Sequence, residues 1–159
     1  MAAPSASVAT AQPAVDPDLP TLDAYQLEDH IGFLLRRAFQ RHAAIFAEGF
    51  ATSGLTPTQF AALVKTVQSR KVTQNLLGRL TAMDPATIQG VVRRLIERGL
   101  ITREDDPLDR RAAVLVPTEA AFALIAATLP TIAAVQEATL ATLSMAERQT
   151  LKRLLLAIG

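Results

Sequence analysis

The residues from Met83 to Pro117 constrain the fold more than any other part of the chain. Asp84 followed by Pro85 has the character of a helix N-cap and a first helical residue. The apolar residues that follow recur at helical spacing, at Ile88, Val91, Val92, Leu95 and Ile96. Gly99 is placed to end this helix in the left-handed conformation that glycine adopts easily. The stretch therefore predicts a helix over 85–98.

Two short segments rich in β-prone residues follow, over 100–104 and 112–116. The turn between them, 105–111, contains two aspartates and a proline and then Asp-Arg-Arg. A helix followed directly by a hairpin with a cationic tip is what a winged helix-turn-helix requires, since the helix enters the major groove and the wing contacts the backbone or minor groove. The alternative is an ordinary helix and hairpin whose arginines are solvated.

Composition favours helices and keeps any nucleic-acid surface local. Half of the 159 residues are hydrophobic and only 4% are aromatic, with many alanines and leucines. The formal net charge is +1, so the whole protein is not a polycation. Between Arg70 and Arg111, however, nine basic residues face six acidic ones. This modest bias can orient an acidic partner such as DNA without proving that one binds.

Several classes of protein and site are not expected. The absence of cysteine excludes disulfides and thiolate metal sites, and His30 and His42 are the only histidines, so we expect no metal and no cofactor. We find no nucleophile paired with a base and no glycine-rich phosphate loop, and we expect no enzyme. We see no apolar run of about 18 residues and no basic residue before Arg36, so we expect neither a membrane span nor a signal peptide, and a cytoplasmic location.

The N-terminal half divides into an arm and three helices. Residues 1–22 are rich in Ala, Pro and Ser and are predicted to be disordered. A long amphipathic helix is predicted from about Asp23 to Ser53-Gly54. Thr56 has the residues of a capping box behind it and should begin the next helix, and Thr73 should cap a short third one. These precede the helix at Asp84.

The C-terminal part is predicted to contain two helices. Thr118 should cap a long and very apolar helix, in which Pro130 should produce a kink or strain one turn. Ser144 and Glu147 have the spacing of a capping box and should open the last helix. The apolar stripes of these two helices are too large for one small lobe to bury, which favours a homodimer.

In this order of elements the chain resembles the multiple-antibiotic-resistance regulator (MarR) family of winged helix-turn-helix transcription factors. The residues that carry the resemblance are Leu55–Phe60, Leu95–Arg103, Asp106–Ala112 and Leu115–Glu119. An Asp-Pro-x-Asp-Arg-Arg wing at this distance after Arg-Gly-Leu-Ile-x-Arg is a specific signal. The sequence departs from the family at Ala121, where glycine is usual, and at Gly90, where many relatives carry a basic or polar residue.

The resemblance implies a mainly α fold, with a winged helix-turn-helix lobe over 54–117. The helices over 23–52 and 118–159 would form a dimerisation arm within a single domain, 23–159. It also implies a ligand-responsive repressor that binds a pseudo-palindromic operator in double-stranded DNA as a homodimer.

The expected DNA-binding residues lie on three elements. Gln89 can pair with adenine and an arginine can pair with guanine, while other arginines contact phosphates. Because Gly90 has no side chain to contact a base, the base contacts are expected from its neighbours on the helix. By resemblance, the arginines of the wing contact DNA and an aspartate orients them. The full set is Thr73, Gln74, Thr87, Gln89, Arg93, Arg94, Asp109, Arg110 and Arg111.

The first helix carries the candidate effector site. The run Gly32–His42 is similar to regulators of aromatic-acid and hydroxycinnamate catabolism, some of which respond to an aromatic coenzyme A thioester. We expect an aromatic acid or its thioester, with the charged part near Arg36, Arg37 and Arg41 and the ring near His42, Phe46 and Phe60. Alternatively, the arginines are solvated or pair with acidic neighbours, and His42 is a hydrogen-bonded core residue.

A second class of function stays open from the sequence. The chain could be a helical ligand-binding or protein-interaction module without sequence-specific DNA binding. Operator affinity that does not respond to charge-neutral substitution of Arg110 and Arg111 favours that module.

Overall fold

The computed structural model describes residues 25–105 and 113–159, which belong to two compact units. The first unit ends at Arg36 and the second comprises Arg37–Gly159. In the first unit a short 3₁₀ helix, Leu27–Asp29, precedes the start of helix α1 (Ile31–Gly49). The predicted arm, 1–22, and the predicted helix start at Asp23 lie outside the described residues, and among those described α1 begins only after the 3₁₀ turn.

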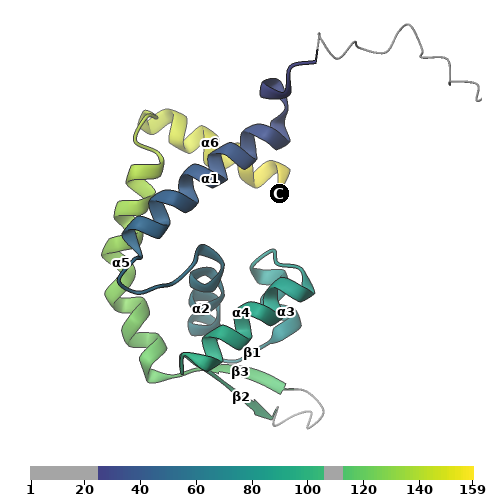
Figure 1. Ribbon diagram of the computed structural model, residues 1–159, viewed down its shortest axis with the longest axis vertical. Helices are drawn as coiled ribbons and strands as arrows, with labels where there is room; N and C mark the ends of the chain where they lie inside the picture. The colour runs from purple at the N-terminus through teal and green to yellow at the C-terminus, as the bar shows by residue number, and fades with distance from the viewer. Residues whose placement is uncertain (1–24, 106–112) are drawn as a thin grey trace, which may run out of the picture. The chain divides into compact units, whose positions relative to one another are not determined.

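Three short helices form the helical part of the lobe: α2 (Pro57–Ser69), α3 (Gln74–Leu80) and α4 (Pro85–Glu97) (Figure 1). Each begins where its capping residue predicted, at Thr56, Thr73 and Asp84. The capping box at α2 is complete, because the Thr56 hydroxyl accepts from the Gln59 N–H and the Gln59 side chain accepts from the Thr56 N–H. Local capping signals therefore set these boundaries correctly.

The wing belongs to a small antiparallel sheet of three strands: β1 (Val72–Thr73), β2 (Ile101–Asp105) and β3 (Ala113–Pro117). The strands lie in the order β1-β3-β2, with Arg103 opposite Leu115. The hairpin was predicted within one residue. β1 was not predicted, because two residues that pair with β3 only in the folded chain have no periodicity of their own.

The core joins the end of α1 to the lobe. The rings of Phe46 and Phe50 stack at 4.0 Å between centroids, and both are almost fully buried. Gly49 lies so close to α5 that an added Cβ would come within 2.9 Å of the Val135 side chain. α1 ends at Gly49, earlier than the Ser53-Gly54 predicted, and Gly54 instead forms the following turn with φ +62°.

The helix α4 has the predicted start, end and buried face. Ile88, Val91, Val92 and Leu95 are buried, and Gly99 adopts φ +67° as expected. The predicted stripe also included Ile96, which is 37% exposed because it lies at the edge of that face. α4 packs on α2, on α3 and on the start of β2.

Two further helices complete the second unit: α5 (Glu119–Thr139) and α6 (Met145–Ile158). α5 extends away from the sheet (Figure 1). Both predicted caps are present, at Thr118 and in the Ser144–Glu147 capping box, and Pro130 lies inside α5 without ending it. Arg148 fixes the turn between the two helices by donating to the Leu143 carbonyl and by pairing with Glu137 at 2.6 Å.

The expectation that no segment is long and apolar enough for a membrane span is wrong by the criterion of length and composition. α5 meets that criterion, with a mean hydropathy of 1.5 over 18 residues. The reason is that alanines continue its apolar character between the larger side chains. One such helix is weak evidence for a span, since a helix at a protein interface has the same composition.

Candidate nucleic-acid interface and effector pocket

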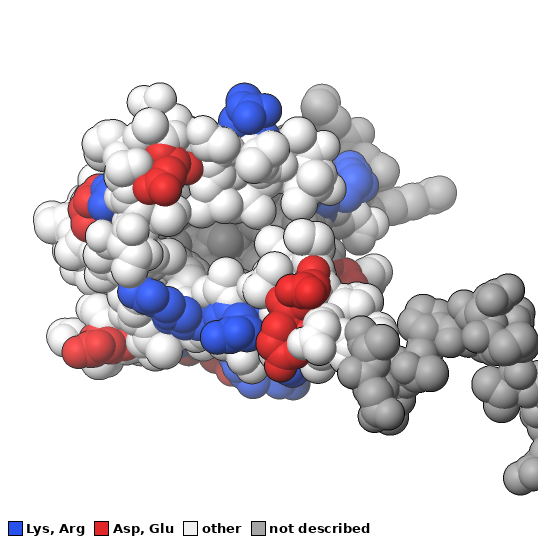
Figure 2. All heavy atoms as spheres, turned by 90° about the horizontal axis from the view of Figure 1, so that it is seen from above, with Lys and Arg blue, Asp and Glu red and all other residues white. Residues whose placement is uncertain are grey.

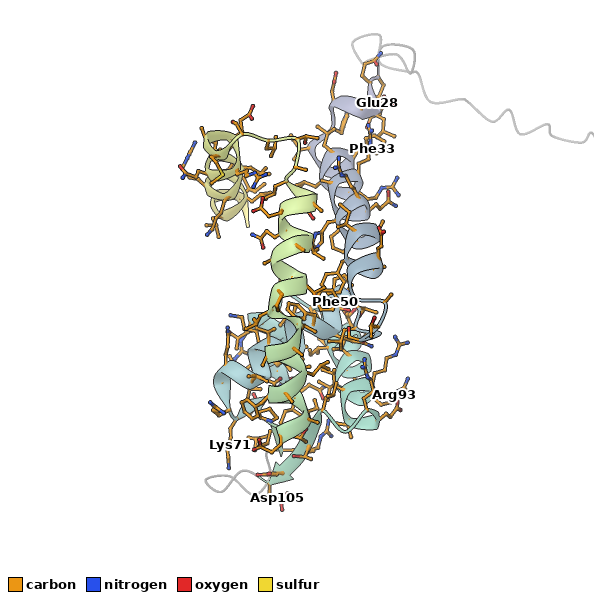
Figure 3. All side chains as sticks on the ribbon, turned by 90° about the vertical axis from the view of Figure 1, so that its left-hand side faces the viewer. Glu28, Phe33, Phe50, Lys71, Arg93 and Asp105 are labelled. Atoms are coloured by element: carbon orange, nitrogen blue, oxygen red, sulfur yellow. The ribbon has the colours of Figure 1, made fainter. Side chains whose placement is uncertain are left out.

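The outer face of α4 carries the residues predicted to read DNA. Thr87, Gln89, Arg93 and Arg94 are all exposed, opposite the buried face of the helix. Arg93 extends outward from α4 in Figure 3, and its Nε lies 3.7 Å from the Glu97 carboxylate one turn later. Both members of this pair are more than 60% exposed, so the pair adds little stability and leaves Arg93 available to an anion.

Thr87 is engaged with the cap of its own helix. Its hydroxyl donates to Asp84 at 2.5 Å, and the N–H groups of Thr87 and Ala86 donate to the same carboxylate. The Thr87 hydroxyl, followed by the Thr87 backbone N–H, holds the pKa of Asp84 below its ordinary value. Thr87 therefore serves the N-cap of α4, and its hydroxyl oxygen remains available only as an acceptor.

Thr73 and Gln74 occupy the start of α3, beside the wing strands. The Thr73 hydroxyl accepts from the Leu76 N–H as the N-cap. The Gln74 Oε1 accepts from Arg103 Nη2 at 3.0 Å, which links α3 to β2. Gln74 also carries two amide N–H donors, which suit a phosphate or a guanine edge. The sequence analysis did not single out Arg103 as a residue of this surface, because its partner Gln74 lies 29 residues away in the chain.

The wing tip itself is not part of the described chain. Asp109, Arg110 and Arg111, predicted to contact DNA, lie in 106–112, outside the described residues. The strands that lead to it are described, and the pairing of Asp105 with Ala113 is the last before the tip. Lys71 approaches Glu104 at 3.8 Å across the sheet.

A pocket of about 610 Å³ lies between α1, α5 and α6 in the second unit. Its walls are mainly apolar and include Leu140, Leu151 and Leu155. Polar side chains reach it from three helices: His42, Gln136, Arg148 and Lys152. An apolar pocket with a few polar groups is the usual form of a small-molecule site.

The tautomer of His42 follows from its hydrogen bonds. Thr139 donates its hydroxyl proton to the Val135 carbonyl at 2.8 Å, while its oxygen lies 3.0 Å from His42 Nδ1. Because a hydroxyl has one proton, Nδ1 must carry the hydrogen and donate to Thr139. The other ring nitrogen, Nε2, is then the group that can accept from a ligand when neutral or donate to it when protonated.

The predicted aromatic residues lie together behind His42. The Phe46 ring centroid is 6.1 Å from the His42 ring and 5.8 Å from the Phe60 ring. Phe46 is only 1% exposed, whereas Phe60 is partly buried. The Phe46 ring therefore packs against His42, and the Phe60 ring packs against Phe46.

The predicted arginines lie along α1. Arg41, next to His42 in the chain, is exposed, as is Arg37. Arg36 belongs to the first unit, where its guanidinium lies 5.8 Å from the centre of the Phe33 ring. Lys and Arg side chains form separate groups on the largely uncharged surface in Figure 2. No continuous basic patch is seen on the face that it views.

The structure adds pocket residues that the sequence analysis missed. Gln136, Arg148 and Lys152 lie on α5 and α6, whereas all the predicted ligand residues lie on α1 and α2. Their spacing resembles that of any amphipathic helix, so no sequence signal identifies them. Over 25–105 and 113–159, no group of three or more His, Asp or Glu side chains is arranged to hold a metal ion.

Large apolar side chains remain exposed on α6. The largest exposed fractions are 69% for Met145, 73% for Leu156 and 67% for Ile158. On α1 of the second unit, Phe39 is 58% exposed. A cluster of exposed apolar side chains on a folded chain indicates a surface that another protein covers.

Comparison with known proteins supplies the family. The profile of the MarR family matches residues 53–112, which include α2, α3, α4 and the strands β1 and β2. The transcriptional repressor NicR of Pseudomonas putida is 37% identical over 131 residues, which are 82% of this chain and 83% of NicR.

Solved structures give the same result. A probable transcriptional regulator from Pseudomonas aeruginosa superposes with a TM-score of 0.81 at 48% identity, covering 84% of this chain and all of that one. Bordetella bronchiseptica BpsR, whose DNA binding is regulated by 6-hydroxynicotinic acid, gives 0.80 at 34% identity, over 84% of this chain and 96% of BpsR. These proteins are transcriptional regulators, not enzymes.

Proposed function

Because the chain belongs to the MarR family of DNA-binding transcriptional regulators, we propose that it is a homodimeric repressor of genes for aromatic-compound catabolism. An aromatic carboxylate, or its coenzyme A thioester, binds at His42 and releases the protein from its operator. The observation that carries this proposal is the imidazole of His42, which offers one free nitrogen at a mainly apolar pocket. The location of such a repressor is the cytoplasm.

The lining of the pocket favours a flat acid. Leucines can cover an aromatic ring, and His42, Arg148 and Lys152 can meet a carboxylate or a ring hydroxyl. BpsR, which is regulated by a hydroxylated heteroaromatic acid, supports the same class of ligand. In this proposal the ring lies beside His42 with Phe46 and Phe60 behind it. Arg36, Arg37 and Arg41 serve the charged part of the ligand, which in a thioester includes its phosphates.

The DNA-binding half uses the exposed face of α4 and the wing. α4 enters the major groove with Gln89, Arg93 and Arg94, while Arg110 and Arg111 contact the minor groove and Asp109 orients them. Thr73 and Gln74 contact phosphates and position the protein on the duplex, whereas the Thr87 hydroxyl, which is left only as an acceptor, can meet a donor on a base edge. A homodimer places two such helices on half-sites about one helical turn apart, roughly 10 bp.

The dimer explains the exposed apolar side chains of α6. A second copy can cover Met145, Leu156 and Ile158; because Met145 and Leu156 also line the pocket, the second copy would border the ligand. Membership of a DNA-binding family favours this function over the alternative of an interaction module without DNA binding.

Calorimetric titration of the purified protein tests the effector directly. The ligands are hydroxycinnamates, benzoates and 6-hydroxynicotinic acid, and the thioesters of the first two. We expect micromolar binding of one class, weakened about tenfold or more by His42→Ala or Arg41→Ala. If no ligand binds, or if both variants bind a ligand as tightly as the wild type does, the proposed effector site is wrong. The proposed DNA binding is not affected by that result.

A further inference from the structure

Arg98 joins the end of α4 to a distant turn. It is the C-cap of α4, and its Nη2 donates to the Ser53 carbonyl at 2.7 Å. Its Nη1 donates to the Gly54 carbonyl at 3.3 Å. The two carbonyls belong to the turn between α1 and α2, more than 40 residues earlier. One guanidinium thus holds two consecutive peptide groups, a geometry that its planar fork of donors suits.

The turn is itself fixed to the end of α1. The Ser53 hydroxyl donates to the Phe50 carbonyl at 3.1 Å, and the Gly54 N–H donates to the same oxygen at 2.9 Å. Gly54 adopts φ +62°, a left-handed conformation that glycine takes without a Cβ penalty. The two acceptors of Arg98 therefore keep a defined position relative to Phe50.

Phe50 is connected by packed rings to the effector pocket. Phe50 stacks on Phe46 with an interplanar angle of 9°, and Phe46 meets the edge of His42. The three residues follow one another at intervals of four, on one face of the helix and its extension. Close-packed rings have little space to slide independently, so these contacts can transmit a shift of His42 to Phe46 and Phe50.

The other contacts of α4 are of a different kind. Val91, Val92 and Leu95 hold the helix by apolar packing, which has no preferred direction along the helix axis. The bonds of Arg98 are directional and charge-assisted, and they act at the C-terminal end of α4, where a cation is also favoured by the helix dipole.

We propose that Arg98 is a positioning residue that couples α1 to the recognition helix. When α1 shifts, the turn at Ser53-Gly54 shifts, and Arg98 carries the end of α4 with it, so that the DNA-reading face changes its angle to the groove. The role of a ligand in moving α1 rests on the proposed function. The coupling between the two helices does not, and it can be measured without a ligand.

A double-mutant cycle on operator affinity tests the coupling. The operator is selected by the full-length protein from a randomised duplex pool, and Phe46→Leu perturbs α1. We expect Phe46→Leu to change the operator Kd, and we expect Arg98→Ala to reduce that change by about threefold or more. Additive effects, within about 1.5-fold, overturn the proposal. Phe46→Met replaces Phe46→Leu if melting curves show that the first variant is not folded.

Two further variants separate coupling from simple loss of stability or charge. Arg98→Lys keeps the charge but places its donors on a single nitrogen, so it should restore part of the coupling. Arg94→Ala removes another arginine of α4 and should weaken operator binding while leaving the effect of Phe46→Leu unchanged. If Arg94→Ala reduces the coupling as much as Arg98→Ala does, Arg98 has no specific role. The same conclusion follows if Arg98→Lys restores none of the coupling.

The ligand provides an independent readout. If 6-hydroxynicotinic acid weakens operator binding by the wild-type protein, the factor of weakening should fall toward one in Arg98→Ala, and an unchanged factor overturns the proposal. If no tested acid or thioester affects the wild type, the effector assignment fails, and the mutant cycle alone decides the role of Arg98.

Discussion

The imidazole of His42 and the hydroxyl of Thr139 lie 3.0 Å apart, measured from Nδ1 to Oγ1, and join α1 to α5. Thr139 has already donated its proton to the Val135 carbonyl, so the hydroxyl can only accept from the ring. This relay fixes both the tautomer and the orientation of a residue that lines the pocket. A ligand that binds the second nitrogen of His42 therefore meets a preorganised group.

Thr139→Val should weaken ligand binding by about tenfold, the effect of losing one good hydrogen bond. Valine keeps the shape of threonine but cannot accept from Nδ1, so the ring loses its fixed tautomer. Thr128→Val is the matched control. The Thr128 hydroxyl bonds only within α5, to the Leu124 and Ile125 carbonyls, so this variant should bind the same ligand within about twofold. Equal losses in the two variants, measured by calorimetry, contradict the relay.

Gln89→Ala and Arg111→Ala should have different effects on DNA binding. Gln89 lies on the outer face of α4 and is proposed to read a base, so its loss should relax preference at one operator position by about 1–3 kcal/mol. Arg111 is proposed to contact the backbone or minor groove, so its loss should weaken all sequences alike and reduce the dependence of log Kd on log salt by about one unit. Binding to a set of single-base operator variants at several salt concentrations distinguishes the two. If Gln89→Ala weakens binding to all the operator variants by the same factor, Gln89 only positions the protein on the DNA.

Leu156→Asp should convert the proposed dimer into a monomer. The side chain is 73% exposed on α6, and burying a charge in an apolar interface is strongly unfavourable. Sedimentation velocity at micromolar concentration measures the change. Arg153→Asp places an aspartate on the same helix at a position that is already charged and exposed, and this variant should remain dimeric. A wild-type protein that sediments as a monomer rules out the proposed assembly.

The capping box of α6 should make stability depend on pH. The Ser144 hydroxyl and then the Ser144 N–H, both donating to Glu147, hold the pKa of that carboxyl below its ordinary value of 4.5. A lowered pKa means that the charged carboxylate stabilises the fold above pH 4.5, and that this stability is lost as the pH falls through the folded value.

Glu147→Gln removes this contribution without removing the side chain. Its urea midpoint should lie below that of the wild type at pH 7, and the two midpoints should converge as the pH approaches 3. Ser144→Ala removes the first donor and also the N-cap acceptor of the Glu147 N–H, so its midpoint should approach that of the wild type as the pH falls but should stay below it. A difference from the wild type that stays constant from pH 7 to pH 3 contradicts the assignment.

Features set by neighbouring residues could be predicted from the sequence. Asp84 caps α4 by accepting from backbone N–H groups two and three residues later, and Gly99 ends it through its own backbone freedom. Such signals act within one turn, so reading them needs no knowledge of the fold. The order of helices and hairpin followed from them.

Features set by residues far apart in the chain could not be predicted. His42 and Thr139 are separated by 97 residues, and Arg98 and Ser53 by 45. Neither pair has a spacing that distinguishes it from other polar residues on helices. Strand β1 was missed for the same reason, because its two residues become a strand only by pairing with Val114 and Leu115. The pocket residues on α6 depend on how α6 folds back, which periodicity does not encode.

Fluorescence anisotropy of a labelled operator tests the central claim most directly. The protein is titrated into the duplex that it selects from a random pool, with and without 6-hydroxynicotinic acid, a hydroxycinnamate and the corresponding coenzyme A thioester. The account predicts nanomolar binding to this operator and at least a tenfold loss of affinity with one of these ligands, in the range of allosteric coupling of about 1–3 kcal/mol. Operator binding that none of the ligands changes contradicts it.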